Sequence, residues 1–181
     1  MNDMTYERRR SEIEHYFDRT AVAAWEKLTS DAPVGRIRES VRAGRDEMRS
    51  ILLEWLGEDL TGKRILDAGC GTGALAVEAA RRGATVVAID LSPTLVDLAR
   101  ERMPNNVADR ITFTSGDMLA PALGEFDHVV AMDSIIHYQT EDAVDALSQL
   151  SERTRQSILF TFAPRTPLLA AMISVGRLLP K

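Results

Sequence analysis

The chain has 181 residues, of which 45% are hydrophobic and 27% are charged, a balance that suits one globular domain with a full core. Its net charge of −5 at pH 7 gives no overall attraction to phosphate backbones, which argues against a nucleic-acid substrate. Cys70 is the only cysteine, which excludes an intrachain disulfide and a cysteine-rich metal site, and we recognise neither a secretory signal nor an apolar run of membrane-spanning length. We therefore expect a cytoplasmic protein without a bound metal.

The first 60 residues are expected to form a helical extension in front of a core domain at residues 61–181. Apolar residues recur at three- and four-residue spacing between Ile13 and Leu28, which predicts an amphipathic helix over about residues 6–28. A second helix is predicted over about residues 34–56. Its expected inner face consists of Ile37, Val41, Met48, Leu52 and Trp55.

The second helix also carries arginines at helical spacing. They are Arg38, Arg42, Arg45 and Arg49. Because acidic residues lie among them, the stripe is typical of a solvated helix face, and we favour that interpretation. The alternative is a basic surface for an acidic substrate or partner.

The core begins with a strand at residues 64–67 that leads into glycines at alternate positions and then into a helix. Glycines allow a tight turn and let the backbone approach a ligand, and the following helix directs free N–H groups to the same point. The sequence from Asp67 to Gly73, DAGCGTG, therefore indicates a nucleotide site. Within it, Cys70 is interpreted as a small residue that fits the turn rather than as a reactive thiol.

Two nucleotide classes compete for this turn. Gly69, Gly71 and Ala74 also satisfy a dinucleotide fingerprint, with Asp90 at the distance expected of a ribose-binding acid. However, Asp67 would repel a pyrophosphate, whereas it would attract the ammonium and sulfonium groups of S-adenosylmethionine. The Asp67-x-Gly69-x-Gly71-x-Gly73 pattern resembles the first motif of the class I S-adenosylmethionine-dependent methyltransferases. This resemblance implies an α/β fold with a Rossmann-like sheet and helices on both faces.

Two further acids follow predicted strands. Asp90, with Leu91 beside it, ends a strand at residues 85–89 and is placed to bind the ribose hydroxyls of the cofactor. Asp117 and Met118 follow a strand at residues 111–114. In the class I methyltransferases, an acid here accepts the adenine amino hydrogens and an apolar neighbour covers the ring. We therefore expect these residues to bind cofactor.

A fourth apolar strand over residues 126–132 brings Met132, Asp133 and His137 to the ligand edge. The proline-proline-aromatic signature of enzymes that methylate base amines is absent at this position, which argues further against nucleic acid. Met132 and Asp133 are assigned to the cofactor. His137 is assigned to the acceptor, because its loop position suits that role.

The C-terminal part is predicted to contain a helix from Thr140 that this residue and its acidic neighbours cap, a fifth strand at residues 156–163 and an apolar helix at 168–179. A complete class I methyltransferase sheet continues into an antiparallel pair of strands that this sequence does not supply. We expect a truncated chain with an open sheet edge. The terminal segment is also a candidate for peripheral contact with a membrane.

A narrower resemblance rests on four blocks of sequence, which are residues 15–20 (HYFDRT), 66–73 (LDAGCGTG), 130–138 (VAMDSIIHY) and 162–167 (FAPRTP). Together they resemble the magnesium-protoporphyrin O-methyltransferases. The resemblance implies methyl transfer from S-adenosylmethionine to one propionate of magnesium protoporphyrin IX, in chlorophyll or bacteriochlorophyll synthesis at the photosynthetic membrane. It also implies cooperation with the large, porphyrin-carrying subunit of magnesium chelatase.

The acceptor in that reaction is a carboxylate, which is already an anionic nucleophile at neutral pH, so positioning suffices without a strong base. We expect the N-terminal helix to act as a lid that brings Tyr16 near the sulfonium. His137 would contact the acceptor propionate or the porphyrin magnesium, and Arg165 would pair with the second propionate. The alternatives are a methyltransferase for another small acceptor, an NAD-dependent oxidoreductase, and a non-catalytic module that binds cofactor.

Overall fold

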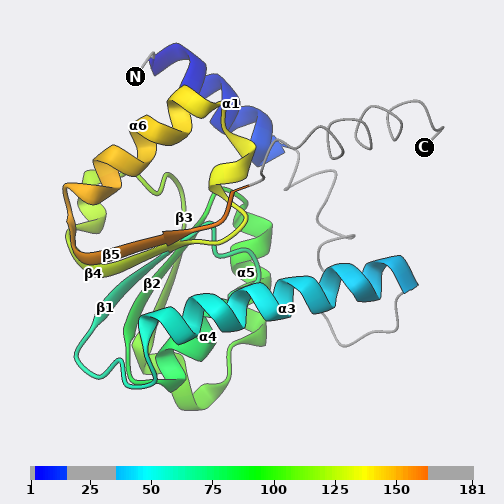
Figure 1. The fold of residues 1–181 in the computed structure, drawn as a ribbon, viewed down its shortest axis with the longest axis vertical. Helices are drawn as coiled ribbons and strands as arrows, with labels where there is room; N and C mark the ends of the chain where they lie inside the picture. The colour runs from blue at the N-terminus through cyan, green and yellow to red at the C-terminus, as the bar shows by residue number, and fades with distance from the viewer. Residues whose placement is uncertain (1–2, 16–35, 163–181) are drawn as a thin grey trace.

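The computed structural model describes residues 3–15 and 36–162 (Figure 1). Tyr16, Arg165, most of the first predicted helix and the last predicted helix lie outside these residues. The expectation that the sheet lacks its last, antiparallel pair of strands also concerns residues outside the described ranges. The division of the chain near residue 60 stays a prediction.

The centre of the molecule is a five-stranded parallel sheet in the order β3-β2-β1-β4-β5 (Figure 1). The strands are β1 (Arg64–Ala68), β2 (Thr85–Asp90), β3 (Ile111–Ser115), β4 (Phe126–Ala131) and β5 (Thr154–Phe160). The strand order reverses between β1 and β4, and in such sheets the loops that diverge at this point leave a crevice beyond the carboxyl ends of the strands. The predicted site residues follow these strand ends.

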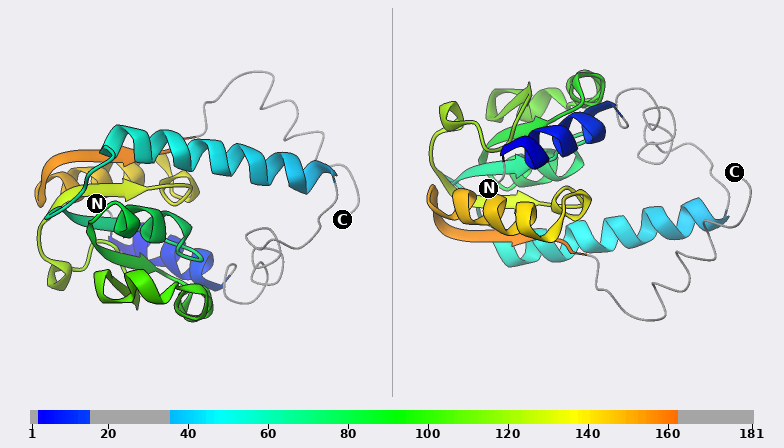
Figure 2. Two further views of the ribbon diagram at one scale, coloured as in Figure 1. Left: turned by 90° about the horizontal axis from the view of Figure 1, so that it is seen from below. Right: turned by 90° about the horizontal axis from the view of Figure 1, so that it is seen from above.

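Helices cover both faces of the sheet, as predicted (Figures 1 and 2). One face carries α3 (Arg36–Leu56), α4 (Ala74–Arg81) and α5 (Pro93–Arg102), and the other carries α6 (Thr140–Ser151), with α1 (Asp3–His15) on the same side. The short 3-10 helices are η2 (Asn105–Arg110), η3 (Pro121–Leu123) and η4 (Ile135–His137). None of the helices described is long and apolar enough to cross a membrane.

Two hydrophobic clusters, one on each face, hold the sheet in place. The larger joins α3, α4 and α5 to β1 and β2, and its buried side chains include Leu52, Leu53 and Ile65. The smaller includes Phe126 of β4 and Leu150 of α6. β1 lies between the two clusters and is buried from Ile65 to Ala68, so the glycine turn starts from a strand that is packed on both faces.

Several predicted details are wrong. Trp55 and Val41, which we assigned to the inner face of the second helix, are 68% and 47% exposed. The helix is amphipathic as expected, but its buried stripe passes through Leu52, Leu53 and Leu56, and Trp55 lies to one side of that stripe. The spacing of apolar residues predicted where the helix lies, but it did not predict which residues lie at the margin of its buried face.

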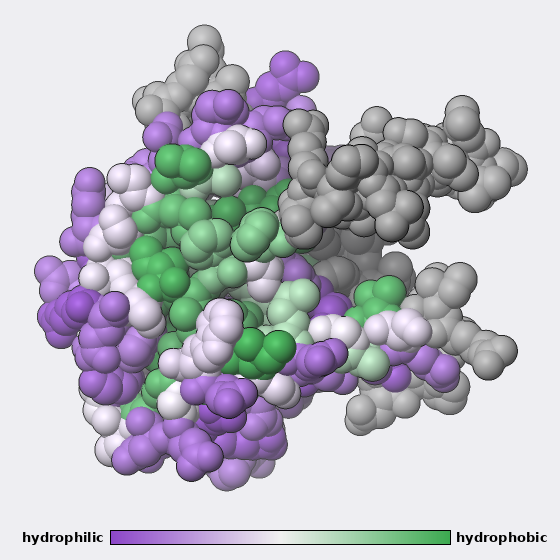
Figure 3. Space-filling model, in the orientation of Figure 1, coloured by the Kyte–Doolittle hydropathy of each residue, from purple (hydrophilic) through white to green (hydrophobic). Residues whose placement is uncertain are grey.

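The cap of α6 and the bounds of β5 also differ from the prediction. α6 begins at Thr140 after Gln139, which occupies the N-cap position without a side-chain hydrogen bond. β5 starts at Thr154, where it pairs with Phe126 of β4, and it ends at Phe160. In the described part of the chain β5 pairs only with β4. Figure 3 shows an apolar surface over β5. Val144 of α6 and Phe160 of β5 are large apolar side chains that are exposed.

Candidate functional site

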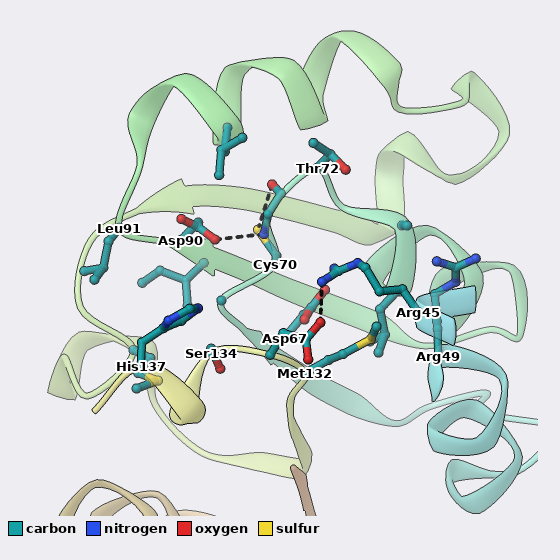
Figure 4. A pocket seen from close by; sticks show the side chains of 18 of the residues that line it. Arg45, Arg49, Asp67, Cys70, Thr72, Asp90, Leu91, Met132, Ser134 and His137 are labelled. Carbon is teal, nitrogen blue, oxygen red and sulfur yellow. Dashed lines mark hydrogen bonds and ion pairs between the residues drawn. The ribbon is translucent and has the colours of Figure 1, made fainter. Parts of the chain in front are cut away.

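A cavity of about 310 Å³ lies at the carboxyl ends of the central strands, at the lower end of the size range of small-molecule sites. Its walls are the glycine turn at residues 69–74, the ends of β2 and β4 with their loops, and one side of α3. Figure 4 shows these side chains converging from the sheet and from α3. The cavity therefore joins the cofactor residues predicted after separate strands.

Glycine is required at position 69 for two reasons. The residue has a φ of 87°, and a Cβ there would lie 2.3 Å from the Cβ of Ser134. The turn is fixed by the N–H of Gly69, which donates to the carbonyl of Ile89 at 2.8 Å, and by the Ser134 hydroxyl, which donates to the carbonyl of Ala68 at 2.6 Å. The loop after β4 thus packs directly against the turn.

Asp67 is the most deeply buried charged group of the cavity. Its side chain is 2% exposed, and its Oδ2 atom has no hydrogen-bond partner among the described residues. Burial and the nearby charge of Asp90 raise its pKa to about 7. A buried carboxyl with an unpaired oxygen is costly, and a cationic ligand group would remove that cost.

Asp90 lies across the glycine turn from Asp67. Its Oδ2 accepts from the N–H of Gly71 at 2.8 Å, and its Oδ1 accepts from the N–H of Ser92 at 2.9 Å. Burial raises the pKa of this carboxyl. Each carboxylate oxygen can accept a second hydrogen bond, so Asp90 is oriented by backbone and can still bind ligand hydroxyls. Leu91 lines the same wall.

Cys70 and the neighbouring glycines complete the turn. Burial raises the pKa of the Cys70 thiol, and the charge of Asp67 adds to this effect. The residue therefore stays a thiol at neutral pH, in line with our interpretation of it as a small packing residue. Gly71 and Thr72 also line the cavity, and Gly73 precedes α4 with a φ of 80°.

The loop after β3 contributes Met118 to the cavity, but the carboxylate of Asp117 contacts α1. The hydroxyl of Tyr6 donates to Asp117 Oδ1 at 2.8 Å, and Arg10 donates to Oδ2 at 2.8 Å. The ring of Tyr6 also stacks on Tyr138 with 5.3 Å between centroids. The predicted adenine-binding acid is therefore covered by the N-terminal helix, a contact that the sequence analysis missed.

The loop after β4 contains an unusual backbone conformation. Asp133 has a φ of 57° and is the only non-glycine residue with positive φ in the described segments. Its N–H donates to the hydroxyl of Thr161 at 2.7 Å, and its carboxylate pairs with Arg45 of α3. Such conformations cost free energy and persist where neighbouring contacts hold them.

His137 lines the cavity, as its predicted role requires. Burial lowers its pKa, and the charge of Arg9 acts in the same direction. The backbone carbonyl of His137 accepts from Arg9 Nε at 2.7 Å, so α1 also contacts this loop. The imidazole is therefore neutral at pH 7 and suited to hydrogen bonding rather than to charge pairing.

Three of the four arginines in the stripe of α3 do not form a solvated face, which corrects the interpretation that we favoured. Arg42, Arg45 and Arg49 line the cavity with Asp46, and Figure 4 shows Arg45 directed toward the sheet. The spacing of the arginines was visible in the sequence. The direction of the stripe depends on how α3 packs against the sheet, which spacing alone does not give.

Arg45, Asp133 and His137 also line a second, shallow hollow beside the cavity. Its remaining residues come from α3 and η4. They are Ser40, Val41, Gly44, Met48 and Ile136. The described residues hold no group of three or more side chains suited to a metal ion.

Comparison with known proteins relates the sequence and the fold to methyltransferases. The family profile described as "Methyltransferase domain" matches residues 65–157. The chain is 51% identical to the magnesium-protoporphyrin O-methyltransferase of Rhodobacter capsulatus, over 95% of this chain and 77% of that protein. It is 31% identical to the Synechocystis protein of the same name, over 93% of this chain and 74% of that protein.

The structural comparison agrees with the sequence comparison. The crystal structure of magnesium protoporphyrin IX methyltransferase from Synechocystis with bound S-adenosylhomocysteine superposes with a TM-score of 0.85 and 30% identity. The match covers 95% of this chain and 80% of that one. A second structure of that enzyme, with bound S-adenosylmethionine, has a TM-score of 0.80.

Proposed function

This chain belongs to the magnesium-protoporphyrin O-methyltransferase family, and we propose that it methylates one propionate carboxylate of magnesium protoporphyrin IX with S-adenosylmethionine. The product is the monomethyl ester, an intermediate of chlorophyll and bacteriochlorophyll synthesis. The observation in the structure that carries the proposal is the buried Asp67 carboxyl with an unpaired oxygen beside the glycine turn. It fits a cationic cofactor and would repel a pyrophosphate.

The residues of the cavity divide naturally among the parts of S-adenosylmethionine. Asp67 would hold the ammonium group, and Asp90 would accept the ribose hydroxyls. Met118 would cover the adenine ring, and Asp117 would accept its amino hydrogens once Tyr6 and Arg10 share that carboxylate. When bound, the cofactor supplies an electrophilic methyl group on a sulfonium.

The acceptor carboxylate needs no activation by a general base. One of its oxygens bonds to the methyl carbon while the carbon–sulfur electron pair returns to sulfur, so no proton is released. The protein therefore acts by holding the two reactants in line and by excluding water. The neutral imidazole of His137 can donate a hydrogen bond to the propionate or bind the porphyrin magnesium.

The lid that we predicted from the N-terminal sequence has support in α1. Tyr6, Arg9 and Arg10 contact the loops after β3 and β4, and Ile13 lines the cavity. We propose that α1 covers the cofactor after binding. The roles of Tyr16 and Arg165 stay predictions, as do porphyrin delivery by the large subunit of magnesium chelatase, the cytoplasmic location and contact with the photosynthetic membrane.

The proposal is tested by incubating the 181-residue chain with S-adenosylmethionine and magnesium protoporphyrin IX. S-adenosylhomocysteine and the porphyrin ester are quantified together by chromatography and mass spectrometry, with magnesium-free protoporphyrin as the control acceptor. We expect equal amounts of the two products. Binding of S-adenosylhomocysteine without ester formation, both in this chain and in a C-terminally extended one, would contradict the proposed acceptor and point to a methyltransferase for another small molecule.

A further inference from the structure

Arg45 is the charged side chain through which α3 contacts the loop after β4. Only 22% of its side chain is exposed, and its partner Asp133 is 19% exposed. A mostly buried ion pair is a costly arrangement, because two charges lose hydration for one mutual attraction. Burial also lowers the pKa of Arg45, which reflects the same loss of hydration.

The position of Asp133 adds to that cost. Its positive φ is held by the hydrogen bond from its N–H to Thr161, and this conformation directs the carboxylate toward α3. Backbone strain of this kind concentrates at sites where a side chain must be held in one place. The chain therefore combines a strained residue and a desolvated cation at one point of the cavity wall.

That point lies between two spaces. Arg45 and Asp133 line both the cofactor cavity and the adjacent hollow. The surface of the hollow is largely apolar, and two of its side chains, Val41 and Ile136, are 47% and 40% exposed. A ligand that spans the cavity and the hollow would pass the guanidinium of Arg45.

Building on the proposed function, we infer that Arg45 is a specificity-determining residue that binds a carboxylate group of the bound reactants. A guanidinium carries five N–H donors in a planar fork, so it can hold Asp133 and a second carboxylate together. Two carboxylates qualify. One belongs to the amino-acid end of the cofactor, beside the ammonium that Asp67 would hold, and the other is a propionate of the acceptor.

The test compares Arg45→Gln with Arg45→Lys and with a control, Arg81→Gln. Arg81 pairs with Glu78 on the exposed side of α4, away from the cavity. Calorimetry gives the Kd of S-adenosylhomocysteine and of 5′-methylthioadenosine, which lacks the amino-acid end. Steady-state methylation at saturating S-adenosylmethionine gives the KM of the porphyrin.

If the cofactor carboxylate is the ligand of Arg45, Arg45→Gln raises the Kd of S-adenosylhomocysteine by roughly tenfold to hundredfold and leaves 5′-methylthioadenosine unchanged. If the acceptor carboxylate is the ligand, the porphyrin KM rises by a similar factor with both Kd values unchanged. Arg45→Lys keeps the charge without the fork and should lie between wild type and Arg45→Gln. Arg81→Gln should match wild type.

Two results would overturn the inference. One is a Kd and a KM that both stay within twofold of wild type in Arg45→Gln. The other is an equal loss of binding for S-adenosylhomocysteine and 5′-methylthioadenosine, which would mean general damage to the cavity. If Arg45→Gln does not fold, Arg45→Lys is judged by the same limits. Failure of the wild-type chain to methylate porphyrin would refute the proposed function alone, because the two Kd measurements do not need the acceptor.

Discussion

The cavity has two walls of opposite charge that are built in different ways. The strand wall places Asp67 and Asp90 at the ends of adjacent parallel strands, deep in the sheet and oriented by backbone. The helix wall places Arg42, Arg45 and Arg49 on one side of α3, and their long side chains extend from the helix to the cavity. Burial raises the pKa of both strand-wall acids.

This difference shows how one cavity can hold a ligand that carries both charges. Rigid carboxyls in a low-dielectric setting favour a cation at one fixed point. Guanidiniums on a helix can adjust to the position of an anion and exchange partners at lower cost, since each has several donors. Breaking either wall should therefore produce a different kind of defect.

The largest effect is expected from Gly69→Ala, which removes the turn that supports the strand wall. The added Cβ would meet Ser134 at 2.3 Å in a residue with a φ of 87°, so either the turn or the loop after β4 must move. We expect S-adenosylhomocysteine binding to weaken by more than about a hundredfold, since strain and steric overlap add to several kcal/mol. Calorimetry measures this.

Gly62→Ala is the matched control for that change. Gly62 also has a left-handed conformation, with a φ of 75°, but a Cβ there meets nothing within 4 Å. It should lower stability by about 1–2 kcal/mol and leave cofactor affinity unchanged. Equal affinities in the two variants would show that the turn does not form the cofactor site.

The next effect concerns the charge of Asp67 and its dependence on pH. Because its pKa is raised to about 7, the carboxyl is protonated below this pH, and a cationic ligand must displace the proton. Cofactor affinity should therefore fall by up to tenfold for each pH unit below 7. Calorimetry between pH 5.5 and pH 7.5 tests this, with Asp67→Asn expected to bind weakly and without that slope.

The same group predicts an opposite trend for the ligand-free protein. The pKa of Asp67 is higher in the folded state than in the unfolded chain, so the folded protein retains the proton as pH rises from about 4 to 7. Its contribution to stability is therefore present at low pH and is lost toward pH 7. Asp67→Asn should raise the Tm more at pH 7.5 than at pH 5.5. A difference that is the same at both values would refute the assignment.

His137→Ala tests the loop after β4, which lies between the cavity and the hollow. The imidazole lines both the cavity and the hollow and is neutral at pH 7, so it should act on the acceptor and not on the cofactor. We expect kcat/KM for the porphyrin to fall by about tenfold to hundredfold with the Kd of S-adenosylhomocysteine unchanged. A variant with wild-type turnover would show that His137 has no role in binding the acceptor.

The smallest effect is expected at the contact between α1 and the strand wall. Tyr6→Phe keeps the ring that stacks on Tyr138 and removes the hydrogen bond to Asp117. One hydrogen bond to a charged group contributes about 1.5–3 kcal/mol, so amide hydrogen exchange in α1 should accelerate by tenfold or more. The amides of β1 serve as the internal control and should not change. Unaltered exchange in α1 would mean that this contact does not hold the lid.

Much of the strand wall could be predicted from the sequence because its parts are local. Asp67 and Asp90 lie at the carboxyl ends of β1 and β2. Gly69 and Gly71 follow β1, and Met118 follows β3, so a parallel sheet brings all of them to one edge. Their positions in the cavity agree with that expectation, while their roles in binding await measurement. The sequence also predicted that Asp117 lies in the loop after β3. Its contact with Tyr6 could not be predicted, because it depends on where α1 packs.

The helix wall could not be predicted for a physical reason. A stripe of arginines with acidic neighbours has the same pattern whether it faces water or a cavity. Only packing against the sheet turns Arg45 toward Asp133, 88 positions later in the chain. The strained φ of Asp133 likewise follows from contacts with Thr161 and α3 and has no signature in its own segment.

The hydrogen bond between Ser134 and Ala68 has a consequence for folding of the chain during its synthesis on the ribosome. It joins positions 66 residues apart, and β1 completes its pairing only when β4 is available. A nascent chain that has released only the glycine motif therefore has no cavity with which to bind cofactor. S-adenosylmethionine can stabilise the finished domain by mass action and extend its lifetime in the cell, but it cannot assist the early steps of synthesis.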